Sequence, residues 1–424
     1  MASAWELDPD RPNAVEFMGK SFVLYQDTDE WVLVDNACSH RLAPLSEGRI
    51  DPATRRLECS YHGWQFEKGQ CVRIPQVDNE TLATAVQNPR CHVPHYPVQV
   101  HKNIIFAWPW PDSDPLDPQN AETWKWPEGL LEGVPANYST YTRDLPYGWT
   151  TLVENIVDPA HVPFAHHGLQ GKREDAVPIR MTRVQANRPE GFLFDFQDRT
   201  MKMEREATGI LRAPYVVQYG GVFEPDKEVD EPKTFNLTTC LIPTKPGWSR
   251  IIIFGGPTEK PKEKKKGERF IIKLFRILPT WVVHQFSNRF LDSDLMFLHG
   301  QERELERNSQ GYFLPAPADR CVTAWRQWVQ KYAPNVPSGP LPEAPAEPFD
   351  RFHQHTDQCK YCSGALEGIQ KWRKNAYRLL AVSVMLSKHV VARVSVVGCL
   401  LLLRILASIE PSLKRGGFKH YQNH

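Results

Sequence analysis

The chain has 424 residues, with 51 basic and 50 acidic side chains, so its net charge is close to zero. This balance gives no electrostatic reason to expect a nucleic-acid partner, and the length allows two or three domains. The nine cysteines are an odd number without the dense spacing of a secreted disulfide framework. Metal binding therefore explains some of them better than disulfide bonds do.

The first predicted elements are two short strands, Phe22–Tyr25 and Trp31–Val34, separated by a polar turn. Their β-branched and aromatic residues predict a hairpin in a small β domain. Two pairs of possible metal ligands follow on loops, and they combine two thiolates with two imidazoles. These residues are Cys38 and His40 in the first pair, and Cys59 and His62 in the second.

This ligand set is typical of a Rieske [2Fe–2S] cluster, in which two histidines replace two cysteines on one iron. The replacement raises the reduction potential to roughly −150 to +300 mV, from about −400 mV for an all-cysteine cluster. A structural zinc site is the alternative. A single residue between Cys38 and His40 argues against it, because zinc-finger pairs usually have at least two.

A proline-rich stretch, Pro109–Pro118, predicts a domain boundary. Beyond it, alternating apolar segments predict antiparallel strands. These segments are Gly191–Gln197, Pro214–Tyr219, Thr234–Ile242 and Arg250–Phe254. Residues 268–306 have helical apolar spacing interrupted at Pro279. The pattern predicts an α+β domain with one antiparallel sheet and flanking helices.

A second metal site is predicted around His161 and His166. Five residues correspond to about 500° on an unbroken helix, which would turn the two imidazoles away from each other. Pro163 predicts that the helix ends or kinks between them, so that both can face one ion. Two imidazoles with one carboxylate form the facial triad of non-haem Fe(II) oxygenases. The carboxylate must come from elsewhere in the chain.

Near the C-terminus, Cys359 and Cys362 form a C-x2-C pair. The pair allows a zinc site, a redox dithiol or a structural role, and His353 and His355 could complete a metal site. Farther on, Val390–Leu406 is apolar, with Arg393 and Arg404 near its ends. It predicts a membrane anchor, as a short span or an interfacial hairpin, and an amphipathic docking helix is the alternative.

Residues 36–49 and 57–66, which contain the cluster ligands, resemble the Rieske domain of chloroplast oxygenases that act on chlorophyll pigments. That family includes pheophorbide a oxygenase, Tic55, the protochlorophyllide-dependent translocon component and, more distantly, chlorophyllide a oxygenase. The resemblance covers nearly the whole chain. It implies a helix-grip catalytic domain, and the C-terminal cysteine pair favours the first three branches.

The resemblance also implies roles for individual residues. The family pattern Asn-x2-Asp-x2-His-x4-His matches Asn155, Asp158, His161 and His166. It implies that Asp294 is the third iron ligand, with Asp292 as the competitor. Asp158 is expected to link His161 to the Rieske His62 of a neighbouring subunit, which implies a homotrimer.

The predicted organisation has four parts: a Rieske domain at 1–112, a mononuclear iron domain at 113–345, a C-x2-C segment at 346–375 and a hydrophobic tail at 376–424. The predicted activity is oxygenation of a chlorophyll-derived tetrapyrrole with O₂ and electrons from ferredoxin, as in pheophorbide a oxygenase. Alternatives are a protochlorophyllide or phyllobilin hydroxylase, a redox-sensing translocon component without turnover, or a pure electron-transfer subunit. A thioredoxin-responsive dithiol and a chloroplast membrane location, envelope or thylakoid, are implied by resemblance; no transit peptide is visible.

Overall fold

The computed structural model describes residues 1–107, 129–134, 138–200, 202–223, 233–257, 278–308, 310–336, 339–386 and 390–420. The predicted boundary at Pro109–Pro118, with the domain limit at residue 112, lies outside these residues. So do residues 268–277 of the predicted helix, as well as part of the stretch between the two C-terminal helices.

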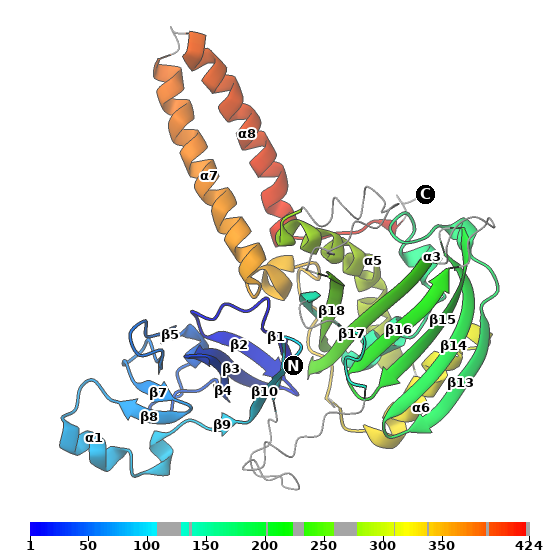
Figure 1. Cartoon of the computed structure of the whole chain (residues 1–424), viewed down its shortest axis with the longest axis horizontal. Coiled ribbons are helices and arrows are strands. Elements are labelled where there is room, and N and C mark those ends of the chain that lie inside the picture. The colour runs from blue at the N-terminus through cyan, green and yellow to red at the C-terminus, as the bar shows by residue number, and fades with distance from the viewer. Residues whose placement is uncertain are drawn as a thin grey trace.

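Three small antiparallel sheets form the N-terminal domain (Figure 1). The first contains β2 (Asn13–Phe17), β3 (Lys20–Asp27), β4 (Glu30–Asp35) and β9 (His95–Tyr96). The second contains β5 (Arg49–Ile50), β6 (Leu57–Glu58), β7 (Gln65–Glu67) and β8 (Gln70–Arg73). The third contains β1 (Ala2–Ser3), β10 (Val98–His101) and β11 (Ile104–Ala107), and α1 (Asn79–Ala85) follows β8.

The predicted hairpin is confirmed as β3 and β4, which pair Val23 with Val34 and Tyr25 with Val32. All four of these side chains are buried. The β-branched and aromatic residues that favour strands therefore also supply the core beneath the cluster loops.

A seven-stranded antiparallel sheet forms the second domain, confirming the predicted α+β class. In spatial order its strands are β12 (Tyr138–Leu145), β18 (Trp248–Pro257), β17 (Lys233–Lys245), β16 (Val216–Phe223), β15 (Met203–Arg212), β14 (Gly191–Thr200) and β13 (Arg180–Arg188). One close approach in it requires glycine. Gly209 lies opposite Phe194, and a Cβ at Gly209 would lie 2.2 Å from the Phe194 ring.

Helices pack against this sheet and position the second site. They are α2 (Trp149–Ile156), α3 (Val162–Ala165), α5 (Thr280–Arg307) and α6 (Arg320–Tyr332). The rings of Trp149 and Trp325 meet edge to face at 4.9 Å and join α2 to α6 in the main core. The backbone N–H of Gly148, at the start of α2, donates to the Glu302 carboxylate of α5 at 2.8 Å. This contact ties the beginning of α2 to α5.

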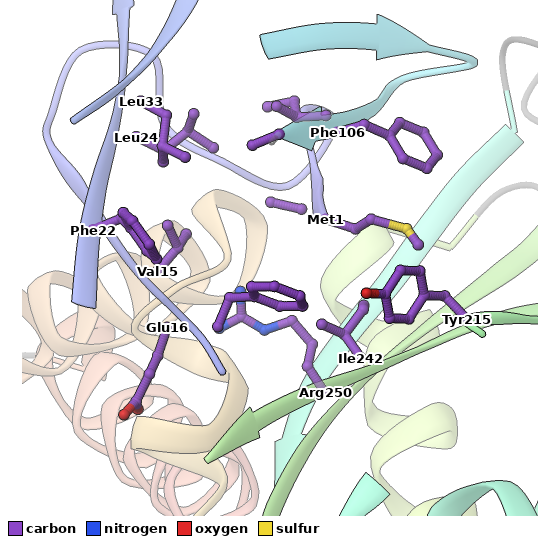
Figure 2. A pocket seen from close by; sticks show the side chains of 14 residues that line it. Met1, Val15, Glu16, Phe22, Leu24, Leu33, Phe106, Tyr215, Ile242 and Arg250 are labelled. Atoms are coloured by element: carbon purple, nitrogen blue, oxygen red, sulfur yellow. The ribbon is translucent and has the colours of Figure 1, made fainter. Parts of the chain in front are cut away.

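The N-terminal domain docks on the edge of the large sheet near β12, β17 and β18. The Gly19 N–H donates to the carbonyl of Thr244 at 2.6 Å, and Lys245 pairs with Glu16 at 2.9 Å. Between the domains lies an apolar cavity of about 130 Å³. In Figure 2, Phe22 and Leu24 line it from the N-terminal domain, with Tyr215 on the opposite side.

Two long helices, α7 (Lys360–Met385) and α8 (Val390–Lys414), project from the body of the molecule as a hairpin (Figure 1). Helix α7 runs without a break through the predicted boundary between residues 375 and 376, so the C-x2-C segment and the tail are joined by one helix. In the described part of the chain, α8 is the helix long and apolar enough to cross a membrane. Large apolar side chains such as Met385, Val391 and Leu401 are exposed on the hairpin.

Candidate functional site

The two predicted cluster loops have the same backbone geometry. Leu42 N–H donates to the Cys38 carbonyl at 2.8 Å, and Gly63 N–H donates to the Cys59 carbonyl at the same distance. Leu42 and Gly63 both have positive φ, 60° and 72°. Glycine adopts this conformation readily, whereas leucine is strained in it. The loops therefore present their cysteines as a matched pair.

Burial separates the thiols from the imidazoles of this site. Cys38 and Cys59 are buried, whereas His40 is exposed and His62 is partly exposed. The two imidazole rings lie 4.6 Å apart, and His40 stacks on Trp64 at 4.7 Å. Partial desolvation by the surrounding loop and the neighbouring His62 lower the pKa of His40, which favours the neutral ring that binds metal. This donor set fits a cluster with one iron inside and one facing the surface.

Helix α3 places the second predicted pair of ligands, and here one sequence expectation was wrong. Helix α2 already ends at Ile156, before either histidine. His161 is the N-cap residue and His166 the C-cap residue of the single-turn helix α3, which has Pro163 in its first turn. Proline is tolerated there because the first N–H groups have no partner within the helix. The proline therefore begins a helix rather than ending one.

The side chains of His161, His166 and Asp294 converge, with their ligand atoms all within 4.8 Å of one another. Asp294 comes from α5, and its Oδ2 lies 3.3 Å from Nε2 of His166. His166 Nδ1 donates to Ser293 Oγ at 2.7 Å, because the Ser293 hydroxyl itself donates to the Phe290 carbonyl. Nε2 of His166 is thereby left as a bare nitrogen that can bind a cation.

His161 is oriented in the same way, by a carboxylate. Its Nδ1 lies 3.3 Å from Asp158 Oδ2, and the other oxygen of Asp158 accepts the Ala160 N–H at 2.8 Å. Burial lowers the pKa of His161, but the Asp158 hydrogen bond and the Asp294 charge outweigh it, and the pKa is raised. The arrangement is that of a metal-ligating histidine held by a second carboxylate.

Burial shifts the other two groups toward their neutral forms. It lowers the pKa of His166 to about 2, with the nearby His161 contributing. It raises the pKa of Asp294 to about 6, against the opposing effect of His161. A cation placed between these side chains would meet a neutral imidazole and would favour the ionised carboxylate.

The competing carboxylate, Asp292, lies in a different environment. Its Oδ1 is 2.7 Å from Arg143 and its Oδ2 is 2.6 Å from Arg351, and both Arg143 and Asp292 are fully buried. Two arginines already neutralise this carboxylate, so it is not directed at the histidines. The geometry therefore favours Asp294 over Asp292 as the third ligand.

Two cavities meet at His161 and Asp294, and His166 lines the first of them. One has a volume of about 430 Å³ and is mainly apolar, lined by residues that include Phe196, Tyr219, Ile253 and Phe290. The other is about 740 Å³, more polar and reaches Phe313 and His420. Asn155, Asp158, His161 and Asp294 border both cavities. Both volumes lie in the usual range of small-molecule sites, roughly 300–1,000 Å³.

The C-x2-C cysteines lie away from these cavities, at the base of the helical hairpin. Cys359 and Cys362 are buried beside His355, one of the two histidines proposed above as further ligands, and beside His284, a residue distant in the chain. His353 is 74% exposed and pairs with Asp350 instead. No sequence signal linked His284 to the cysteines, because it belongs to α5, more than seventy residues earlier.

Comparisons with known proteins match this organisation. The family model for a Rieske [2Fe-2S] domain matches residues 1–97, and the one for pheophorbide a oxygenase matches residues 212–312. Pheophorbide a oxygenase, chloroplastic, of Arabidopsis thaliana is 31% identical over 87% of this chain and 72% of its own length. The chain belongs to the pheophorbide a oxygenase family of Rieske oxygenases.

Other members of this family differ in their named activities. Flavonoid 8-hydroxylase 2, chloroplastic, of Ocimum basilicum is 33% identical over 87% of this chain and 73% of its own length. Protochlorophyllide-dependent translocon component 52, chloroplastic, of Arabidopsis thaliana is 32% identical over 85% of this chain and 71% of its own length. The crystal structure of dicamba monooxygenase bound to dicamba has a TM-score of 0.58 at 16% identity, covering 76% of this chain and 92% of that one, and shares the fold.

Family membership confirms several predictions. As a Rieske oxygenase the protein is an enzyme that uses a [2Fe–2S] cluster, a mononuclear non-haem iron and O₂, and it needs a redox partner and a substrate. The chloroplast location is confirmed by its plant relatives, which are named chloroplastic. The assignment of individual residues to the two metal centres stays a prediction that the geometry supports.

Proposed function

We propose that this oxygenase inserts oxygen into a chlorophyll-derived tetrapyrrole, as the name of pheophorbide a oxygenase describes for its relative. The observation that carries the proposal is the convergence of His161, His166 and Asp294 beside an apolar cavity of about 430 Å³. Part of that cavity, including Tyr219, Leu237 and Phe290, belongs to the segment matched by the pheophorbide a oxygenase model. Aromatic and aliphatic walls suit a flat, apolar pigment.

We assign the cluster to Cys38, His40, Cys59 and His62, and the mononuclear iron to His161, His166 and Asp294. When bound, the cluster supplies single electrons and the iron supplies O₂ activation. The protein's own contribution is orientation. Ser293 and Asp158 hold the Nδ1 protons of the two histidines, which leaves both Nε2 atoms directed at the metal position.

We infer a homotrimer, as the resemblance implies, and the separation of the two proposed centres within one chain supports an electron path between subunits. Figure 1 shows β5 and β7, which belong to the N-terminal domain with the proposed cluster ligands, on the opposite side of the molecule from α3. Asp158 borders the 740 Å³ cavity and is partly exposed, so a histidine of a neighbouring subunit could reach it. We infer that Asp158 would link His161 to a cluster-binding histidine of the neighbouring subunit, so that the electron path would run between subunits, with a ferredoxin-like protein as the external donor.

Changing Asp158 to asparagine is expected to lower product formation by about 10- to 100-fold, the usual effect of losing a carboxylate that orients a ligand. The cluster and iron contents should be unchanged, and the reduced cluster should reoxidise more slowly when substrate and O₂ are added. Asp319→Asn is the matched control, because Asp319 borders the same cavity and caps a local turn. Equal reoxidation rates in the two variants would refute a relay through Asp158.

A flavonoid is the second candidate substrate, favoured by the 33% identity to flavonoid 8-hydroxylase 2 over most of both chains. Protochlorophyllide a and a linear phyllobilin are further tetrapyrrole candidates, and a redox-sensing role without turnover is the non-catalytic alternative.

We also propose that α8, with its exposed apolar side chains, anchors the enzyme to an envelope or thylakoid membrane.

Single-turnover incubation of the reduced protein with isotopically labelled O₂ tests the proposal. Pheophorbide a, protochlorophyllide a, a phyllobilin and a flavone are supplied separately, and products are analysed by mass. One labelled oxygen in a tetrapyrrole supports the proposal, and one in the flavone supports the second candidate. His161→Ala should abolish labelling without altering the visible and EPR signals of the cluster. Absence of labelling with every compound would favour the sensor role.

A further inference from the structure

Four buried side chains converge at the base of the α7–α8 hairpin, away from both proposed iron centres. They come from separate parts of the chain: α5, the π-helical turn Phe352–Thr356, and the start of α7. Each is at most 2% exposed, and their ligand atoms all lie within 4.8 Å of one another. The four residues are His284, His355, Cys359 and Cys362.

The distances between thiols and imidazoles match one tetrahedral ion. His355 Nε2 lies 3.2 Å from Cys362 Sγ, and His284 Nδ1 lies 3.6 Å from both Cys359 Sγ and Cys362 Sγ. Zinc bonds of about 2.3 Å to sulfur and 2.0–2.1 Å to nitrogen place tetrahedral S and N ligands about 3.6 Å apart. In a Rieske cluster, by contrast, the thiolates and imidazoles bind different irons.

The two imidazoles are also held in the tautomers that a metal requires. His355 Nδ1 donates to the Thr142 carbonyl at 2.6 Å, and His284 Nε2 donates to the Thr140 carbonyl at 3.1 Å. Both carbonyls belong to β12, an edge strand of the large sheet, where the C=O groups of alternate residues point toward the same edge. The opposite nitrogen of each ring is therefore bare and directed at the cysteines, as in most histidines that bind metal.

We propose that His284, His355, Cys359 and Cys362 bind one structural Zn²⁺ ion. Binding releases the two thiol protons, so that one divalent cation is neutralised by two thiolates and two neutral imidazoles. A buried site with no net charge avoids the large cost of an uncompensated ion. The four protein ligands leave no open position, which is typical of a structural rather than a catalytic zinc.

The proposed zinc site would connect separate elements of the structure. It joins the start of the helical hairpin to β12 and to α5, and α5 also carries Asp294. His284 and Asp294 are ten residues apart on that helix, about 15 Å along its axis. The N-terminal segment is attached here too, since the Lys360 N–H donates to the Glu6 carbonyl at 2.8 Å. The ion would thus fix the hairpin relative to the catalytic domain.

Metal analysis of the full-length, iron-loaded protein tests the proposal. We expect close to one zinc per chain in addition to iron, and X-ray absorption at the zinc edge should show two sulfur and two nitrogen neighbours. His355→Ala and Cys362→Ser should reduce zinc to near zero and lower the thermal midpoint. His353→Ala, an exposed histidine two residues away, and Cys399→Ser, a buried cysteine in α8, are matched controls that should keep the zinc.

The wild-type protein alone can refute the proposal, so a variant that fails to fold does not leave it undecided. A fully iron-loaded sample with no zinc would overturn it, as would iron bound at these four residues. A Cys359–Cys362 disulfide in the isolated protein would also overturn it and would support the redox dithiol. Because none of these readouts measures oxygenation, the zinc site stands or falls independently of the proposed substrate.

Discussion

Asp294→Ala is expected to abolish product formation while leaving the Rieske cluster intact. The carboxylate lies 3.3 Å from Nε2 of His166 and is the acidic member of the three converging side chains. Without it, two histidines alone would have to retain the iron, and facial-triad sites depend on the carboxylate. Iron should therefore fall from three to two per chain, with acid-labile sulfide and the cluster EPR signal unchanged.

When both proteins are compared without the mononuclear iron, the thermal midpoint of Asp294→Ala should stay close to that of wild type. Burial raises the pKa of Asp294 to about 6, which means that the ionised carboxylate destabilises the folded, metal-free protein. Removing it should therefore not lower the free energy of unfolding. His161→Ala should give the same loss of product and iron. Full iron content and continued turnover in Asp294→Ala would exclude this residue as a ligand.

Asp292→Ala is expected to destabilise the fold by about 3–5 kcal/mol, because it leaves the guanidinium groups of Arg143 and Arg351 without their shared carboxylate. Removing one partner of a buried ion pair costs far more than the pair itself contributes. The thermal midpoint should fall by roughly 10 °C. Any protein that folds should still bind three irons.

Glu304→Ala is the matched control for Asp292→Ala. Glu304 lies on the same helix and pairs with Arg307 at 3.1 Å, but both side chains are 71% exposed. Exposed pairs contribute about 0–1 kcal/mol, so the midpoint should hardly change. Calorimetry compares the two variants. If Asp292→Ala is as stable as Glu304→Ala but loses iron, the roles assigned to the two aspartates are reversed.

The family resemblance favoured Asp294, but residue spacing alone gave no physical reason to reject Asp292. The two aspartates are two residues apart on α5, which separates their side chains by about 200° around the helix. One therefore faces the buried arginines and the other faces His166. The resemblance implied that a carboxylate in this segment completes the triad. Which side of α5 faces α3 is set by the packing of α5 against β12 and α2.

The cysteine pair shows more clearly that residue spacing alone does not predict contacts between distant parts of the chain. The C-x2-C spacing placed Cys359 and Cys362 together, and the nearby histidines suggested a site. Proximity in the chain could not distinguish the exposed His353 from the buried His355, nor could it bring in His284 from α5. Their assembly depends on the carbonyls of Thr140 and Thr142, which hold both imidazoles in place.

By itself the sequence indicated the features that depend on local spacing: the proposed cluster ligands Cys38, His40, Cys59 and His62, the His161–His166 pair, the antiparallel strands and the apolar tail. Ligand spacing and side-chain alternation involve residues that are close together in the chain, so both patterns can be recognised in the sequence. Only the tertiary structure decided which distant groups meet. It showed why Asp294, which the resemblance had already favoured, faces the histidines while Asp292 does not, and it joined His284 to the cysteines, because those contacts depend on how helices and sheets pack.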